Sequence, residues 1–171
     1  MQKRQTAPAL VKKAAGGDEA AFSQLVRENQ SCLYAAALAI TRHEQDALDA
    51  VQDAVLKGWQ KLPTLREPQY FRTWLTRIAI NCALNKAKRR PNHIQLMEDT
   101  PAPGTDYARR MDVRRAIDGL DEKTRVCVML YYLEDMPIAE IAKAVGILQG
   151  TVKSRLHRAR TQLREALRDY E

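Results

Sequence analysis

The sequence predicts an all-α protein of two small helical domains joined by a flexible linker. Apolar residues recur at steps of three and four along most of the chain, whereas few stretches alternate with a period of two. The helical pattern stops at residues 91–108, where prolines, a glycine and acidic residues occur without any lysine or arginine. We therefore expect domains at residues 1–90 and 109–171, with a linker at 91–108.

The composition fits a globular protein with a polyanionic partner. Of 171 residues, 45% are hydrophobic and 29% charged, which is ordinary for a folded soluble chain. The net charge of +7 suits nucleic acid, because lysine and arginine neutralise phosphates and release their counterions. No apolar run is long enough to cross a bilayer, and the polar N-terminus lacks the apolar core of a signal peptide. We expect a cytoplasmic protein that reaches a membrane only through a partner.

Metal and cofactor chemistry find no support in the sequence. Cys32, Cys82 and Cys127 are far apart, form no metal-binding pair and sit among apolar residues, so we expect buried, reduced thiols. The histidines at positions 43, 93 and 157 are too scattered for a metal or catalytic cluster. We therefore expect no metal, no cofactor and no catalytic residue.

The first domain is expected to begin with three consecutive helices. Gly16 and Gly17 end one helix, and Asp18 caps the next, which runs to about Thr41. A further helix starts near Asp46 and stops at Pro63. The inner faces of these two helices are expected at Phe22, Leu25, Val26 and Leu33, and at Leu48, Val51, Val55, Trp59 and Leu62.

After a loop at residues 63–68, another helix carries Phe71, Trp74, Leu75, Ile78, Cys82 and Leu84 and precedes the basic run from Lys86 to Arg90. Phe71 and Trp74 could stack on bases, but aromatic residues at helical spacing are more often part of a core. We therefore expect both rings to pack inside the domain.

The second domain is expected to contain a helix-turn-helix. One helix ends near Gly119, and Asp121 caps the next, whose core residues are Val126, Val128, Met129, Leu130 and Leu133. Pro137 then opens a short helix, and Gly146 suits the positive φ after its end.

The last helix has one apolar stripe and one basic face. The stripe comprises Val152, Leu156, Ala159, Leu163 and Leu167, and the outward residues are Lys153, Ser154, His157, Arg158, Thr161 and Arg164. Such a face can be merely solvated or can bind acidic partners or membranes. The preceding short helix and glycine turn favour DNA, with residues 151–158 in a major groove.

Two motif-bearing blocks in this order resemble the bacterial extracytoplasmic-function (ECF) sigma factors, which give RNA polymerase its promoter specificity. Residues 46–62, with Asp46-Ala-Leu-Asp49, are similar to the family's polymerase-binding helix, and Phe71-Arg-Thr-Trp-Leu-Thr-Arg-Ile-Ala-Ile-Asn81 to its promoter-opening helix. Leu120-Asp-Glu-Lys-Thr-Arg125 and Gly150-Thr-Val-Lys-Ser-Arg-Leu-His-Arg-Ala-Arg160 are similar to its upstream reader. The chain departs from the family pattern at Leu48, where an acidic residue is common, and at residues 147–149, where a proline often occurs.

The resemblance implies partners and site residues. Core RNA polymerase would be bound through the coiled coil of β′, by Asp49, Gln52 and Asp53, and through the flap of β. The residues implied at the minus 10 element are Lys57, Lys61, Arg77, Asn81, Asn85, Lys86, Lys88, Arg89 and Arg90. Those implied at minus 35 are Thr151, Lys153, Ser154, Arg155, His157 and Arg158. The linker would run toward the RNA exit path, and an anti-sigma protein, often membrane-anchored, would silence the chain.

Two other interpretations stay open at this stage. A conventional DNA-binding regulator would use only the second domain, with the first as a dimerisation or ligand-sensing module. An enzyme acting on nucleic acid would have only Asp46, Asp49 and Asp53 as a carboxylate cluster, without a partnering metal cluster, a phosphate loop or a nucleophile elbow.

Overall fold

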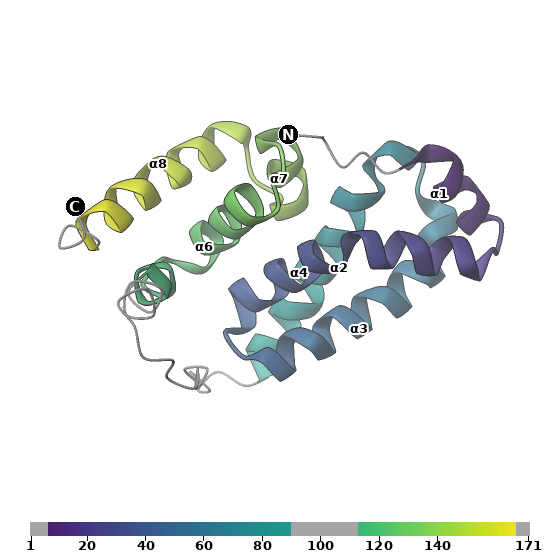
Figure 1. The fold of residues 1–171 in the computed structure, drawn as a ribbon, viewed down its shortest axis with the longest axis horizontal. Coiled ribbons are helices and arrows are strands. Elements are labelled where there is room, and N and C mark those ends of the chain that lie inside the picture. Colours follow the sequence, from purple (N-terminus) through teal and green to yellow (C-terminus); the bar gives the residue numbers. More distant parts are fainter. Residues whose placement is uncertain (1–6, 90–112, 167–171) are drawn as a thin grey trace, which may run out of the picture.

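The computed structural model describes residues 7–89 and 113–166, and every regular element within those ranges is a helix (Figure 1). This confirms the all-α prediction. The predicted linker at 91–108 lies outside the described residues. None of the described helices is long and apolar enough to cross a membrane.

The first unit, residues 7–89, contains four α-helices and two short 3₁₀ turns. The helices are α1 (Pro8–Ala15), α2 (Glu19–Thr41), α3 (Glu44–Lys61) and α4 (Phe71–Arg89), and the turns are Leu62–Thr64 and Pro68–Tyr70. Helices α2, α3 and α4 pack against one another, and α1 packs on α2.

The predicted caps explain where these helices begin and end. Asp18 Oδ1 accepts a hydrogen bond from the Ala21 N–H at 2.9 Å, and α2 ends at Thr41, both as predicted. Helix α3 begins two residues before Asp46, because His43 Nδ1 accepts from the Asp46 N–H at 3.3 Å and serves as the cap. Pro63 stops α3 as expected, and the chain continues as a 3₁₀ turn.

A seam of small residues faces the core along α3. Ala47, Ala50, Ala54 and Gly58 are buried, and a Cβ added at Gly58 would lie 2.6 Å from Leu75 Cδ1 of α4. The placement of Leu48 on the inner face was wrong, since its side chain is 41% exposed. Alanine and glycine bring α4 close to α3, and Leu48, one residue after Ala47, is rotated by about 100° from this seam.

The two aromatic residues of α4 pack inside the unit. Phe71 is fully buried, and the half-buried Trp74 packs against it with ring centroids 5.9 Å apart. The expectation that these rings belong to the core is confirmed. Helix α4 continues through Lys86 to Arg89, so the basic run is helical as far as Arg89.

The second unit, residues 113–166, builds the predicted helix-turn-helix. Residues 113–118 are helical and are followed by α6 (Glu122–Val128), a π-helical turn (Met129–Leu133), α7 (Ile138–Val145) and α8 (Gln149–Ala166). Asp121 caps α6 by accepting from the Thr124 N–H at 3.1 Å. Leu133, expected in the core, is 63% exposed. The π turn widens the helical repeat there and shifts the later side chains out of the α-helical phase.

The turn between α7 and α8 is built as the sequence predicts. Gly146 has a left-handed φ of 75°, where a Cβ would be unfavourable. Val152, Leu156 and Ala159 are buried and Leu163 is half-buried, whereas Leu167 lies outside the described residues.

All three cysteines are buried and free, as expected. Burial raises the pKa of the Cys32 thiol and raises that of Cys127 to about 11. Both sulfurs therefore stay protonated at neutral pH and are poor nucleophiles. The described residues contain no group of histidine, cysteine and acidic side chains that could hold a metal ion.

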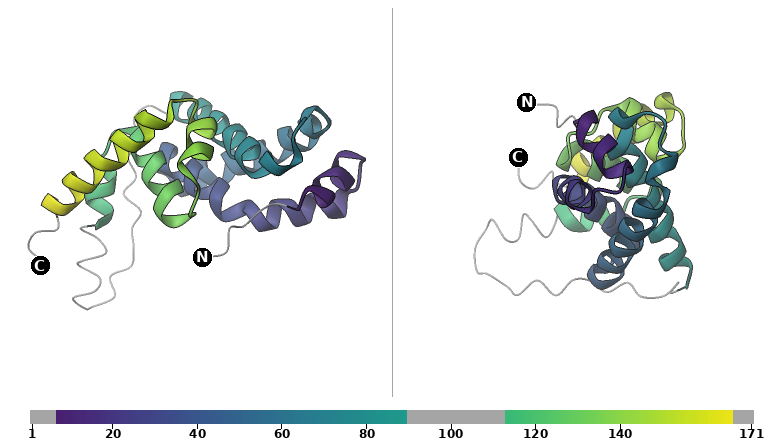
Figure 2. Two further views of the ribbon diagram at one scale, coloured as in Figure 1. Left: turned by 90° about the horizontal axis from the view of Figure 1, so that it is seen from above. Right: turned by 90° about the vertical axis from the view of Figure 1, so that its right-hand side faces the viewer.

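The two units lie against each other. Helix α2 contacts α6 and the π turn, and α4 contacts α7, so that one apolar core continues from the first unit into the second. Figure 2 shows α7 beside α4 and α8 on the outside of the second unit.

Candidate nucleic-acid interface

Four polar residues of α8 form an exposed surface, which we name the α8 face. They are Lys153, Ser154, His157 and Arg158. Their spacing of one, three and one residues places them on one side of the helix, opposite the buried Val152, Leu156 and Ala159. The α8 face thus presents two fixed cations, a hydroxyl and an imidazole to a partner.

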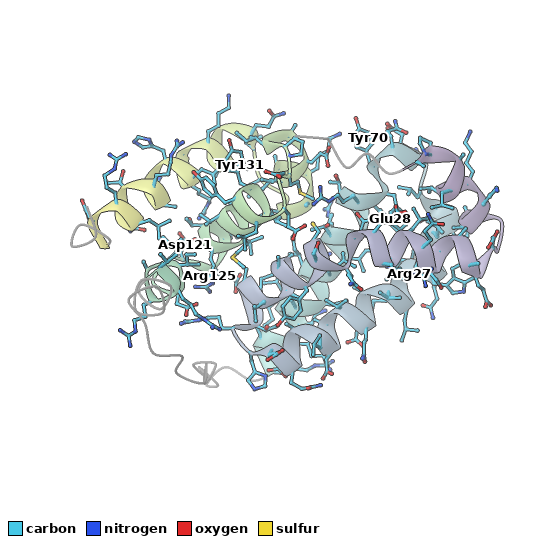
Figure 3. The ribbon with its side chains drawn as sticks, in the orientation of Figure 1. Arg27, Glu28, Tyr70, Asp121, Arg125 and Tyr131 are labelled. Atoms are coloured by element: carbon cyan, nitrogen blue, oxygen red, sulfur yellow. The ribbon has the colours of Figure 1, made fainter. Side chains whose placement is uncertain are left out.

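Arg155, expected near the DNA backbone, makes contacts within the second unit. Its Nη1 donates to Asp121 Oδ1 at 2.7 Å and to Thr124 Oγ1 at 3.0 Å, which ties α8 to the start of α6. Its Nε is buried and makes no hydrogen bond to the described residues. Figure 3 labels Asp121 at the α6 end of this contact.

The pKa of the Asp121 carboxyl is lowered by this arrangement. Partial burial acts to raise the pKa, but the hydrogen bonds from Thr124 and the charge and hydrogen bond of Arg155 outweigh it. Asp121 is therefore a carboxylate at neutral pH, and its charge is paired with Arg155.

Two residues at the start of α8 complete this region. Thr151 is partly exposed, and its carbonyl accepts a hydrogen bond from Ser154 Oγ at 3.0 Å. Leu148, immediately before α8, is 79% exposed and was not among the predicted site residues. The sequence does mark Leu148, because it is an apolar residue in a turn where the family often has a proline.

The predicted promoter-opening residues of α4 divide into two groups. Arg77, Asn81, Asn85 and Lys88 are exposed at steps of four, four and three, so they form one stripe, and Arg89 is exposed as well. Lys86 is half-buried, and its Nζ lies 3.1 Å from Asp49 Oδ2 on α3. Arg90 lies outside the described residues.

The end of α3 carries two more exposed cations, one of which lies beside α4. Lys57 and Lys61 are exposed and lie one helical turn apart. Lys57 Nζ lies 3.5 Å from Cys82 Sγ, and Cys82 follows Asn81 in the sequence. The structure therefore brings Lys57 beside the α4 stripe.

The outer surface of α3 combines acidic and apolar side chains. Gln52 and Asp53 are exposed, while Asp49 interacts with Lys86 and also accepts from Gln45 Nε2 at 3.3 Å. Leu48 and Leu56 are 41% and 64% exposed, and with Gln52 they follow at steps of four. Sequence reasoning assigned Leu48 to the core and did not single out Leu56.

Two family models match the chain. Sigma-70 region 2 matches residues 25–92, and Sigma-70, region 4 matches residues 110–163. The region 2 match contains α3 and α4, and the region 4 match contains α6, α7 and most of α8.

Known proteins are similar to this chain in sequence and in the arrangement of both units. The ECF RNA polymerase sigma factor SigM of Mycobacterium tuberculosis is 32% identical over 155 residues, covering 88% of this chain and 79% of SigM. CnrH, whose structure is solved in complex with the cytosolic domain of CnrY, is 29% identical in sequence. Its structure matches with a TM-score of 0.73 over 96% of this chain and 97% of that chain. Sigma factor RpoE of Bartonella quintana, in complex with the anti-sigma factor NepR, is 25% identical, with a TM-score of 0.69 over 86% of this chain and 96% of that chain. From these matches, the chain belongs to the ECF family of RNA polymerase sigma factors.

Proposed function

We propose that this chain binds core RNA polymerase, directs it to promoters that carry minus 35 and minus 10 elements, and assists strand separation at the latter. The observation that carries the proposal is the α8 face, a basic reading surface on the second helix of a helix-turn-helix. The polymerase performs the chemistry, and this chain supplies sequence recognition.

At the upstream element, α8 lies in the major groove. Arg158 can donate two hydrogen bonds to one guanine, while Lys153, Ser154 and His157 contact neighbouring base edges or phosphates. Leu148 adds an apolar contact with a thymine methyl group, which is the groove feature that suits an exposed leucine. Arg155 ties α8 to the start of α6, so its contribution to DNA binding is mainly one of position, while Thr151 lies near the DNA backbone.

At the downstream element, the α4 stripe follows the displaced single strand. Arg77 and Lys88 neutralise phosphates, whereas Asn81 and Asn85 can donate to and accept from unstacked bases. Lys57 and Lys61 extend the cationic surface from α3, and Arg89 extends it at the end of α4. Arg90, the next residue in the sequence, is proposed for the same role. Lys86 joins when its contact with Asp49 is released.

The outer surface of α3 binds the coiled coil of β′. Asp49, Gln52 and Asp53 supply charge and hydrogen bonds, and the exposed Leu48 and Leu56 supply the apolar area that a stable helix-to-helix contact needs. The second unit contacts the flap of β. Because one solved relative is a sigma factor bound to an anti-sigma factor, we propose the same kind of regulation here, with the chain in the cytoplasm and any membrane attachment through that partner.

The first test is run-off transcription from a randomised promoter library with purified core polymerase, with and without the chain. We expect chain-dependent transcripts whose templates share two spaced upstream elements. Sequence-specific duplex binding without such transcripts would instead show a conventional regulator that uses only its second unit.

A further inference from the structure

Lys57 contacts a buried sulfur at the surface where α3 and α4 meet. Its Nζ lies 3.5 Å from Cys82 Sγ, and Cys82 is only 3% exposed, whereas Lys57 itself is exposed. An ammonium group has three N–H donors and no acceptor, so this contact uses one donor and leaves two for a partner. The sulfur therefore fixes where the Lys57 charge lies without enclosing it.

The contact depends on the close approach of the two helices. Helices α3 and α4 pack side by side (Figure 1), and a Cβ added at the neighbouring Gly58 would lie 2.6 Å from Leu75 Cδ1. A lysine can lie along apolar surface with its charged end in water. At this separation the exposed Lys57 of α3 therefore reaches the buried sulfur of α4 and still presents its ammonium group to solvent.

The α4 stripe has a cation at each end, Arg77 and Lys88, and two uncharged asparagines between them. Cys82 lies about 7.5 Å beyond Arg77 and about 9 Å before Lys88 along the helix axis, at about 1.5 Å per residue. The Lys57 ammonium, which lies against the Cys82 sulfur, therefore adds a positive charge near the middle of the stripe.

Three cations at these intervals suit the backbone of a displaced strand. Steps of about 7.5 and 9 Å correspond to two or three nucleotides at about 3.4 Å per nucleotide. A strand that follows the stripe meets a positive charge at each step, while the asparagines lie beside the bases in between. Without Lys57, the middle step of this path would have no cation.

Lys86, the other lysine between α3 and α4, is held in a different way. Its Nζ lies 3.1 Å from the Asp49 carboxylate, so its charge is paired within the chain. A thiol is only a weak acceptor, and no carboxylate in the described part of the chain pairs with Lys57. Lys57 therefore keeps its charge for a phosphate.

From this geometry we infer that Cys82 is a positioning residue for strand separation at the minus 10 element. Its sulfur holds the Lys57 ammonium in the middle of the α4 stripe before DNA arrives, so that the lysine side chain loses less freedom when a phosphate binds. Capture of the displaced strand rests on the proposed function. The holding of Lys57 by Cys82 is a property of the chain alone.

The holding of Lys57 is tested on the full chain without DNA. Mass spectrometry measures how fast acetic anhydride acetylates each lysine, and an amine that is held in a contact reacts more slowly than a free one. In the wild type we expect Lys57 to react more slowly than Lys61, which is exposed one helical turn away. Cys82→Ala should remove this difference. Equal rates in the wild type would overturn the inference, even if the variant fails to fold.

Strand capture is tested with the polymerase holoenzyme and a promoter from the library that carries a fluorescent adenine analogue in its minus 10 element. We expect Cys82→Ala to lower the equilibrium constant for opening by about two- to fivefold, the lower part of the cost of ordering one lysine side chain. Cys82→Ser keeps an acceptor and should restore opening. Cys127→Ala is the matched control, because it removes a buried sulfur from the second unit, and it should open like the wild type.

Double variants separate positioning from a general structural effect. If Cys82 acts through Lys57, Cys82→Ala has no effect in the Lys57→Met background and keeps its effect in the Lys61→Met background. Equal losses in both backgrounds would overturn the inference, and so would increased opening by Cys82→Ala, which would show that the sulfur withholds Lys57 from DNA. A wild-type chain that opens no promoter would refute the proposed function and strand capture with it, while the acetylation rates still decide whether Cys82 holds Lys57.

Discussion

Replacing Arg158 and Arg155 one at a time distinguishes a base contact from a positioning contact on the same helix. Arg158 is exposed on the α8 face, so Arg158→Ala removes no interaction that holds the unit together. A bidentate contact with guanine is worth about 1 to 3 kcal/mol, which corresponds to roughly a 5- to 150-fold loss of affinity for the matching site. Substituting that guanine in the DNA should cause the same loss, and the two losses should not add.

Arg155→Ala should behave differently. It removes a hydrogen bond to Thr124 and an ion pair with Asp121, whose side chain is 63% exposed and readily hydrated. About 1 kcal/mol for the hydrogen bond and less than that for the ion pair predict a fall of about 1 to 2 kcal/mol in the free energy of unfolding. Affinity should then fall by a similar factor on every DNA sequence, because α8 as a whole is less well held.

The assay is fluorescence anisotropy with matched and mismatched duplexes at one fixed salt concentration, together with urea unfolding. Arg27→Ala is the control, since Arg27 is an exposed arginine of α2 in the first unit, away from α8. Equal losses for Arg158→Ala on all sequences would make Arg158 a phosphate contact. Sequence-selective loss for Arg155→Ala at unchanged stability would refute the positioning role of Arg155.

Three further predictions follow from individual contacts. Asp121→Asn keeps a capping side chain but removes the charge. Because the pKa of Asp121 is lowered in the folded state, the stability that its carboxylate adds is present above about pH 4 and should vanish as the pH falls through the folded pKa. A stability difference that does not change with pH would contradict this. Gly58→Val should lower the free energy of unfolding by about 1 to 3 kcal/mol through overpacking against Leu75. Gln60→Val, at an exposed position of the same helix, should not; urea unfolding midpoints measure both. Leu148→Ser should relax the preference for thymine at one upstream position in the promoter library, and an unchanged library consensus would exclude the methyl contact.

The sequence predicts the helices well because local chemistry determines them. Asp18, Asp121 and Gly146 act at helix ends through their own side chains or backbone freedom, so no distant residue is needed. The apolar stripe of α8 is equally local. Leu48 and Leu133 were misplaced because their exposure depends on tertiary packing and on a π turn, and neither leaves a signal in the apolar spacing.

The candidate site was predictable only as a set of helices. Motif order identifies α3, α4 and α8, but it does not reveal which side chains of those helices already have partners. Arg155 and Asp121 are 34 residues apart, and Lys86 and Asp49 are 37 apart, so no periodicity connects them. The contacts between the two units depend on pairs at still larger separations, such as Arg125 and Ala39.

The contact between Lys86 and Asp49 links the two surfaces that we propose for different partners. Their charged atoms are 3.1 Å apart, and their side chains are 27% and 39% exposed. If β′ engages Asp49 as proposed, Lys86 loses its counter-charge and becomes available to a DNA phosphate. Binding of DNA to Lys86 in turn removes one of the interactions that hold Asp49, which also accepts from Gln45. Linkage requires that each partner change the affinity for the other by the same factor. Because the pair is partly hydrated, this factor is at most about fivefold, the equivalent of about 1 kcal/mol. On the proposed assignments of Asp49 and Lys86, the salt bridge therefore couples polymerase binding and strand capture favourably, without any movement of α3 relative to α4.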